Sequence, residues 1–181
     1  MKKYLVIACL GSLFSTGAFA QSSWKFRSAE YLGLLWGQAG SYGQVQTING
    51  ACNGSWFLGV GVGLDYYRFR SLPLFLSVTK ELMPAKNGLF LSLDGGVNYP
   101  IYHRPAGYYD AGFSTSEFVA GPYWSAGLGY KIKLPAGKDH ALSLLAGYSF
   151  KELKEDAKTY PDPTRYDYRN RRWFLKMGII F

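Results

Sequence analysis

The feature that most constrains this fold is a strict alternation of apolar and small residues that returns along most of the chain. Between Phe57 and Tyr66, large apolar side chains occupy every second position, and Gly or Asp fills the positions between them. Because successive side chains of a strand point to opposite faces, such a segment has one apolar face and one small or polar face. Five further segments alternate in the same way, at 72–79, 89–99, 124–133, 142–151 and 173–181. The chain is therefore predicted to be all-β.

The second face of these segments distinguishes between two kinds of β protein. A soluble β-sandwich usually covers its outer face with polar side chains, whereas Gly and Ser dominate the second face here. Small residues suit the crowded interior of a narrow barrel, and an apolar outside suits lipid. Aromatic residues at the ends of the apolar runs match the interfacial girdles of membrane barrels: Tyr66, Tyr67, Tyr99, Tyr102, Trp124, Tyr148 and Trp173. These patterns predict a transmembrane β-barrel.

The first twenty residues have the composition of an export signal. A basic start and an apolar stretch from residue 4 to residue 14 precede Ala18-Phe19-Ala20. This order is typical of a cleaved secretory signal peptide, and the apolar stretch is shorter than the roughly 20 residues that a membrane-spanning helix needs. A retained anchor and a lipoprotein cut before Cys9 are the alternatives. We predict a signal peptide at 1–20 and one outer-membrane barrel domain at 21–181.

The connections between the segments predict a strand count and a direction. Two weaker segments at 28–37 and 43–49 bring the count to eight antiparallel strands in up-and-down order. At roughly 9 to 11 residues for each membrane strand, the predicted mature chain has room for eight. Every second connection is short, at 49–55, 83–88 and 135–139. The connections between these include two long ones, at 104–121 and 154–169. Outer-membrane barrels have short periplasmic turns and longer external loops, so both termini are expected in the periplasm.

Charge and cysteine content bear on the partners of the chain. Without the two leader lysines it keeps 18 basic and 12 acidic side chains, a net charge of +6, which is less than the dense basic stripe of a nucleic-acid binder. We expect no nucleic acid and, instead, contact with anionic outer-membrane lipid. Only Cys52 remains after the predicted cleavage, as a free thiol or in a disulfide between molecules. The chain has no paired-cysteine metal motif, and we expect no cofactor, no metal and a monomer.

Three stretches resemble a known group of proteins. They are Gln46-Thr47-Ile48-Asn49-Gly50, the segment from Leu58 to Tyr67, and Leu72-Pro73-Leu74-Phe75-Leu76. In these stretches the chain resembles the small outer-membrane β-barrel proteins that are common in Bacteroidetes-type bacteria. The group often has an aromatic residue after Asn-Gly, where this chain has Ala51-Cys52. The resemblance implies an eight-stranded outer-membrane barrel and implies no reaction.

One group of residues could carry a reaction. His103 lies at the expected outer end of a strand, and the loop after it contains Ser114, Ser116 and Glu117. A His that activates a Ser and is itself oriented by a carboxylate is the arrangement of nucleophilic catalysis. Near the external leaflet it could transfer or remove the acyl chains of lipid A. A His and a few hydroxyls in a polar loop also occur by chance, and no motif of the lipid A palmitoyltransferase or deacylase is present.

Charged residues fall into two further groups. The first shares the predicted lumen face and should form ion pairs, because an unpaired charge in a narrow lumen is unfavourable. Its members are Asp65, Glu81, Asp94, Lys131, Lys133 and Lys176. The second lies at the expected external ends of strands, where arginine suits bidentate contact with lipopolysaccharide phosphates; solvated loop charges are the alternative. The cluster comprises Arg68, Arg70, Arg104, Arg165, Arg169, Arg171 and Arg172, of which Arg68, Arg70, Arg104, Arg171 and Arg172 are the leading candidates.

The favoured interpretation is an outer-membrane barrel without catalytic activity, with a structural or interaction role at the cell envelope and possible contact with lipopolysaccharide. One alternative is a lipid A-modifying enzyme that uses His103. Another is a carrier of small hydrophobic molecules through a lateral opening, for which Pro73 is a hint because proline removes a ladder donor. The terminal aromatic Phe181 resembles the signal that the outer-membrane assembly machinery recognises, so this machinery is an expected partner.

Overall fold

The computed structural model describes residues 24–83, 87–101, 115–135, 140–158 and 164–181. Their strands are β1 (Lys25–Gly37), β2 (Gly40–Asn53), β3 (Trp56–Asp65), β4 (Ser71–Glu81), β5 (Asn87–Pro100), β6 (Thr115–Val119), β7 (Gly121–Lys133), β8 (Ala141–Lys158) and β9 (Thr164–Ile180). In these ranges no helix is long and apolar enough to cross a membrane. The predicted leader lies outside them.

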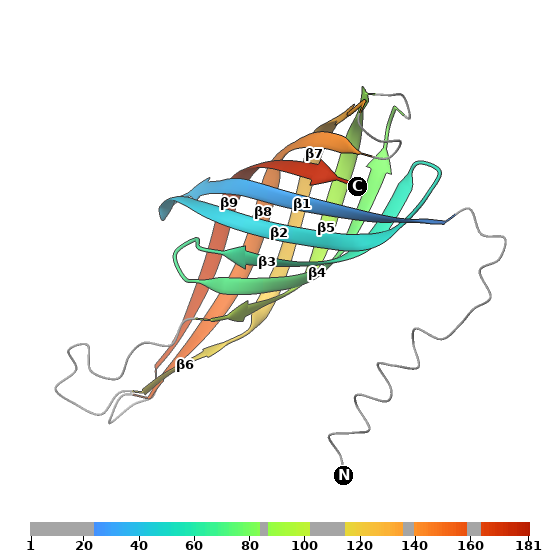
Figure 1. The fold of residues 1–181 in the computed structure, drawn as a ribbon. Coiled ribbons are helices and arrows are strands. Elements are labelled where there is room, and N and C mark those ends of the chain that lie inside the picture. Colours follow the sequence, from blue (N-terminus) through green and yellow to red (C-terminus); the bar gives the residue numbers. More distant parts are fainter. Residues whose placement is uncertain (1–23, 84–86, 102–114, 136–139, 159–163) are drawn as a thin grey trace, which may run out of the picture.

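The strands form one closed antiparallel barrel (Figure 1). Apart from β6, each strand pairs with the strands before and after it, so that β5 pairs with β7. The barrel closes where β1 pairs with β9, from Ala29–Ile180 to Gly37–Arg172. The short strand β6 precedes β7 with only Ala120 between them and pairs with β8 alone. The barrel proper therefore has eight strands, which confirms the predicted fold. We call the end with Phe181 and the β2–β3 turn the turn end, and the opposite end the loop end.

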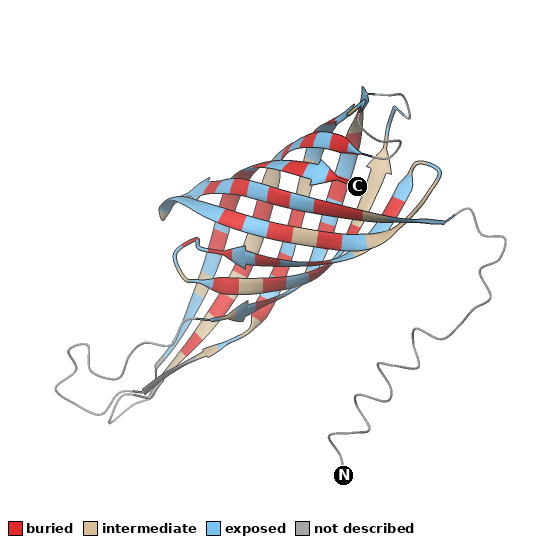
Figure 2. Cartoon of the chain, in the orientation of Figure 1, coloured by how far each residue is buried: buried red, intermediate tan, exposed pale blue. Residues whose placement is uncertain are grey.

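Burial alternates along each strand, as the banding in Figure 2 shows. In β3, Val60 and Val62 are exposed on the outside, whereas Gly61, Gly63 and Asp65 are buried inside. The barrel is therefore apolar outside and mixed or polar inside, the inverse of a water-soluble protein. In a closed barrel every strand pairs on both sides, so no strand edge has unpaired backbone N–H and C=O groups. A β-sheet protein in lipid needs this closure, because the bilayer core has no water to hydrogen-bond such groups.

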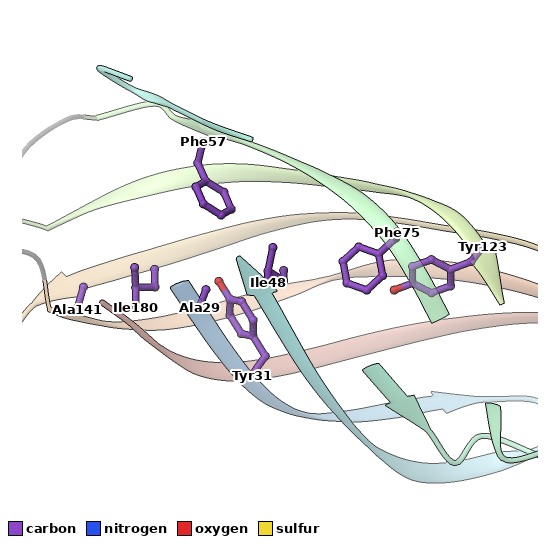
Figure 3. Close-up of a cluster of buried hydrophobic side chains, with 8 residues drawn as sticks. All are labelled: Ala29, Tyr31, Ile48, Phe57, Phe75, Tyr123, Ala141 and Ile180. Carbon is purple, nitrogen blue, oxygen red and sulfur yellow. The ribbon is translucent and has the colours of Figure 1, made fainter. Parts of the chain in front are cut away.

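Aromatic side chains fill much of the interior. A cluster of buried apolar side chains extends from the turn end along the lumen to Phe75 and Tyr123 (Figure 3): Ala29, Tyr31, Ile48, Phe57, Phe75, Tyr123, Ala141 and Ile180. Phe75 and Tyr123 face one another with ring centroids 5.4 Å apart. The lumen glycines make room for such rings, because a Cβ at Gly61 would overlap Phe75 and one at Gly129 would overlap Phe90. The small residues of the second face thus leave space for the aromatic rings that fill the lumen.

A single methyl group should test this packing. We expect Gly61→Ala to destabilise the barrel by about 1–3 kcal/mol, because Phe75 is buried against Tyr123 and has little room to move. Urea unfolding in detergent micelles measures the change. Gly95→Ala is the matched control, since no atom lies within 4 Å of a Cβ at Gly95. Equal stability of the two variants would contradict the proposed packing.

The strands run further than the sequence predicts, and strand residues occupy parts of the expected connections at 49–55, 104–121 and 154–169, the second of which contains β6. Residues 154–158 and 164–169 belong to β8 and β9 and pair from Lys154–Asp167 to Ala157–Thr164. With β6 they form a sheet extension that projects past the other strands at the loop end (Figure 1). At the other end, β2 continues through 49–53, so the predicted turn there shrinks to Gly54 and Ser55.

Among the described residues of the predicted girdles, all but one lie on the outside of the barrel; Tyr102 lies outside the described residues. Trp173 contacts Tyr148 with ring centroids 5.2 Å apart, and Tyr148 contacts Trp124 at 5.9 Å. Tyr67, in contrast, is only 1% exposed and lies inside the barrel, where its hydroxyl accepts a hydrogen bond from the backbone N–H of Ala39. Tyr67 therefore closes the loop end of the lumen and does not belong to a girdle.

Candidate functional site

The structure describes only part of the group of residues that could carry a reaction. His103 and Ser114 lie outside the described residues, and so does Arg104. Ser116 and Glu117 lie in β6, where their backbones pair with Ala157 and Asp156 of β8. The enzyme hypothesis therefore stays a prediction. Among the described residues no cluster of His, Cys, Asp or Glu could hold a metal ion.

The lumen charges form separate groups, of which the one at the loop end is the most buried. Asp65 accepts from the Nη1 of Arg172, and its Oδ1 lies 3.1 Å from the Nζ of Lys151. All three side chains are at most 2% exposed. Lys151 also donates to the hydroxyl of Ser71 at 2.9 Å, and Arg172 donates to that of Ser149 at 3.1 Å. One carboxylate thus holds two cations under Tyr67.

A second carboxylate lies in mid-lumen. Asp94 accepts from the hydroxyls of Ser77 at 2.7 Å and Ser125 at 2.6 Å. The Nζ of Lys176 lies 3.8 Å from its Oδ2 and 4.3 Å from the centre of the Phe174 ring. The charge of Asp94 is therefore balanced by one cation and hydrogen-bonded by hydroxyls on two neighbouring strands.

A third carboxylate lies toward the turn end. Glu81 binds the Nζ of Lys131 at 2.5 Å and the Nη1 of Arg27 at 3.1 Å. These three residues line a small cavity of about 30 Å³, beside Tyr31 and Phe57. Together with the rings of the interior, the three charge groups occupy the lumen along its length.

Sequence reasoning identified the lumen carboxylates but only part of their partners. The structure pairs Asp94 with Lys176 and Glu81 with Lys131, both among the predicted residues. Lys133 was expected in the lumen, yet it is exposed at the rim and makes no ion pair with any described residue. The partners that were missed are Arg27, Lys151 and Arg172. Alternation could have placed Lys151 and Arg172 in the lumen. Lys151 lies on the same inward face of its strand as Ser149, and Arg172 on the same inward face as Phe174.

Three arginines line a pocket at the loop end. Arg68 lies in the β3–β4 connection, and Arg169 and Arg171 lie on β9. The pocket measures about 370 Å³, and its other lining residues are Gln38, Ala39, Tyr67 and Asn170. We call it the arginine pocket. All three arginines are exposed, so their guanidinium groups are accessible from outside.

The local backbone positions the first of these arginines. Arg68 has a φ of 59°, the left-handed region that a non-glycine residue rarely adopts. The preceding turn is fixed by Asp65, whose Oδ1 accepts from the backbone N–H of Tyr67 at 2.8 Å. The Arg68 guanidinium lies 4.8 Å from the centre of the Tyr168 ring. A backbone cost of about 1–2 kcal/mol is thus offset in part by a cation–π contact.

The other predicted phosphate contacts have different surroundings. Arg172 was expected on the external surface, but it is 1% exposed and bound to Asp65 in the lumen, because alternation along β9 turns it inward. Arg70 stacks over Tyr66 at 5.3 Å, away from the pocket. Arg169 has a carboxylate nearby, the Oε2 of Glu152 at 3.5 Å. The structure brings together Arg68, Arg169 and Arg171 of the predicted set around one pocket.

Three further residues lie outside the charge groups and the arginine pocket. Cys52 lies in β2, not in a turn as predicted, and is a half-buried free thiol near the carbonyl of Lys25. His140 is exposed, with its ring 6.3 Å from that of Phe181. Pro73 is buried in β4, and the β3–β4 ladder skips from Val62–Leu74 to Asp65–Ser71 around it. That interruption is local, since pairing continues on both sides.

Comparisons with known proteins agree with the fold. No protein-family model matches the chain, and no curated protein matches it in sequence. Among solved structures, the chain is similar to neisserial surface protein A, NspA, with a TM-score of 0.51 and 13% identity over 88% of this chain and 96% of that one. A major outer membrane protein from Thermus thermophilus has a TM-score of 0.43 and 12% identity over 87% of this chain and 99% of that one. The likeness to NspA agrees with the closed eight-stranded antiparallel barrel of this chain.

Proposed function

We propose that this chain is a non-catalytic outer-membrane barrel that binds lipopolysaccharide phosphates at the arginine pocket. The observation that carries the proposal is the grouping of Arg68, Arg169 and Arg171 around one exposed concavity at the loop end. Planar guanidinium groups match phosphate oxygens in bidentate geometry. The filled lumen supports a binding or structural role and not the passage of ions or solutes, because aromatic side chains and ion pairs occupy the described interior.

The proposal includes a setting for the barrel. Its apolar outside and closed ladder support residence in lipid, and the loop end would then face the cell exterior while both termini lie in the periplasm. In that orientation the arginine pocket meets the leaflet that is rich in phosphate. We further propose a monomer, assembled by the outer-membrane machinery, in the group of small Bacteroidetes-type barrels that the sequence resembles.

Charge removal in the pocket tests the binding function. We expect the double variant Arg68→Gln, Arg171→Gln to retain about tenfold less lipopolysaccharide than wild type, since two charge-assisted contacts that are partly screened by water are lost. The measurement is binding of purified lipopolysaccharide to the full barrel in detergent. Arg165→Gln is the control, because Arg165 lies outside the pocket and faces Asp156 at 3.4 Å.

Two further binding measurements test whether the phosphate groups are what the pocket recognises. Dephosphorylated lipopolysaccharide should bind wild type as weakly as the intact lipid binds the double variant, and added inorganic phosphate should compete if the phosphate group alone is recognised. Binding should also weaken as salt rises. Equal retention by wild type and the double variant would refute the pocket as the binding site.

The enzyme alternative has a separate experiment. If His103 acts on lipid A, the mass spectrum of lipid A from cells with the gene should differ from that of cells without it, and His103→Ala should abolish the difference. We expect identical spectra from all three strains, because the proposed role involves no bond cleavage. A spectral change that depends on His103 would overturn the non-catalytic proposal.

A further inference from the structure

Among the described residues, β1 and β2 carry a polar region on the outer wall toward the turn end. Most outward positions of the described strands carry large apolar side chains. On β1 and β2, four adjacent positions do not: Glu30 pairs with Thr47, and Ser28, which is only 6% exposed, pairs with Asn49. An ionised carboxylate that faces lipid is unfavourable unless it is paired, so this region needs an explanation beyond the fold.

The four side chains hold the carboxylate in a defined position. The hydroxyl of Thr47 donates to Glu30 Oε1 at 2.7 Å, and that of Ser28 lies 3.2 Å from the same oxygen. Asn49 in turn donates to the hydroxyl of Thr47 at 3.3 Å. Among the described residues no Lys or Arg lies within ion-pair distance of Glu30. The hydroxyl of Thr47 thus orients the carboxylate, while that of Ser28 lies closer to Asn49 Oδ1, at 2.8 Å. The negative charge of Glu30 is not balanced by any described Lys or Arg.

A groove adjoins this carboxylate. It measures about 410 Å³ and crosses the outer face of four strands, β2, β1, β9 and β8. Its lining residues are Glu30, Tyr31, Leu32, Val45, Leu142, Met177, Gly178 and Ile179. Apart from Glu30 the lining is predominantly apolar. We call it the wall groove.

The ladder places the charge at the side of the groove nearer the turn end. Glu30 pairs with Ile179, and Ile179 with Leu142, close to where β9 ends and β8 begins. Leu32 and Met177 form the next outward row toward the middle of the barrel wall. A ligand in the wall groove would therefore place a polar group near the rim and an apolar chain along the wall.

We propose that the wall groove binds a phospholipid whose headgroup carries a primary ammonium. The ammonium would pair with the Glu30 carboxylate, and one acyl chain would lie along Leu32, Val45 and Met177. Charge complementarity selects this class, because the groove offers one anion and the ligand supplies the cation together with an apolar chain. The Glu30 end of the wall groove lies toward the turn end, opposite the arginine pocket, and takes a ligand group of the opposite charge.

Native mass spectrometry of the full barrel in detergent micelles tests the proposal. The probes are phosphatidylethanolamine and phosphatidylglycerol with identical acyl chains. We expect wild type to retain about fivefold more of the ethanolamine lipid, and Glu30→Gln to retain the two lipids equally, since one ion pair near a lipid interface is removed. Asp167→Asn is the matched control, a carboxylate-to-amide change on the exposed sheet extension, and should keep the fivefold preference.

A second variant tests the apolar part of the wall groove. Met177→Trp narrows the wall groove without altering charge, and should reduce retention of the ethanolamine lipid even if Glu30→Gln fails to fold. Equal retention of both lipids by wild type, or an unchanged preference in Glu30→Gln, overturns the proposal. It is also overturned if wild type is a dimer that Glu30→Gln converts to a monomer, because the groove then holds a second copy. The Arg68→Gln, Arg171→Gln variant should keep the preference, so this proposal and the proposed function can fail separately.

Discussion

Replacing Asp65 with Asn should destabilise the barrel by about 3–5 kcal/mol, the largest effect of any single change considered. The carboxylate is the ion-pair partner of both Lys151 and Arg172, and all three side chains are at most 2% exposed. Removing it leaves two cations buried without a counter-charge, which is far less favourable than losing an exposed pair. Urea unfolding in detergent micelles, analysed by linear extrapolation, measures the free energy of unfolding.

A paired substitution separates loss of charge balance from loss of packing. We expect the double variant Asp65→Asn, Lys151→Met to recover about 1–2 kcal/mol relative to Asp65→Asn alone, because one of the unbalanced cations is also gone. Asp167→Asn on the sheet extension should change stability by less than about 0.5 kcal/mol, since Asp167 is largely exposed. If Asp65→Asn and Asp167→Asn were equally stable, the buried charge group would have no role in holding the barrel together.

Placing an arginine on the outer wall should be the next most damaging change. Val60 lies in the middle of β3 and is 55% exposed on the outside of the barrel. If lipid surrounds this wall, Val60→Arg should reduce stability in phospholipid vesicles by about 2–4 kcal/mol. In a barrel surrounded by water the same exposed substitution would change stability by less than about 0.5 kcal/mol. The two settings therefore predict clearly different results.

The sheet extension supplies the control for that experiment. Tyr166 is 49% exposed on β9, beyond the ends of most other strands. Tyr166→Arg adds the same side chain to a similarly exposed strand position and should leave the free energy of unfolding nearly unchanged. Equal effects of Val60→Arg and Tyr166→Arg would mean that hydrocarbon does not surround the wall, and the proposed membrane setting would fail.

Strand limits were the part of the fold that the sequence predicted least well. Within the barrel, apolar residues recur at every second position because one face meets the outside and the other the lumen. In the sheet extension the chain reads Lys154-Glu155-Asp156, so polar residues fall on both faces and the alternation disappears. Backbone pairing nevertheless continues there, with Glu155 bonded to the hydroxyl of Tyr168 at 2.7 Å. A pattern based on apolar residues has no means of detecting such strands.

The candidate sites were predictable to different degrees. Alternation assigns Asp65, Asp94 and Lys176 to the lumen without any knowledge of the fold. It also assigns Arg172 to that face, although the predicted strand began one residue later, at Trp173, and left Arg172 in an external loop. The wall groove had no comparable signal, because its lining comes from four strands that meet only when β1 pairs with β9.

The alternation by itself determined that this chain forms strands with an apolar outer face, since the direction of a side chain depends only on its own and neighbouring backbone. Only the tertiary structure decided which charges meet. Asp65 and Arg172 are 107 residues apart in the chain, and their contact depends on strand register, on closure of the barrel and on the width of its lumen. The same dependence places Arg68 beside Arg171 and Glu30 beside an apolar groove, because both sites combine strands whose neighbourhood is set by closure and not by sequence distance.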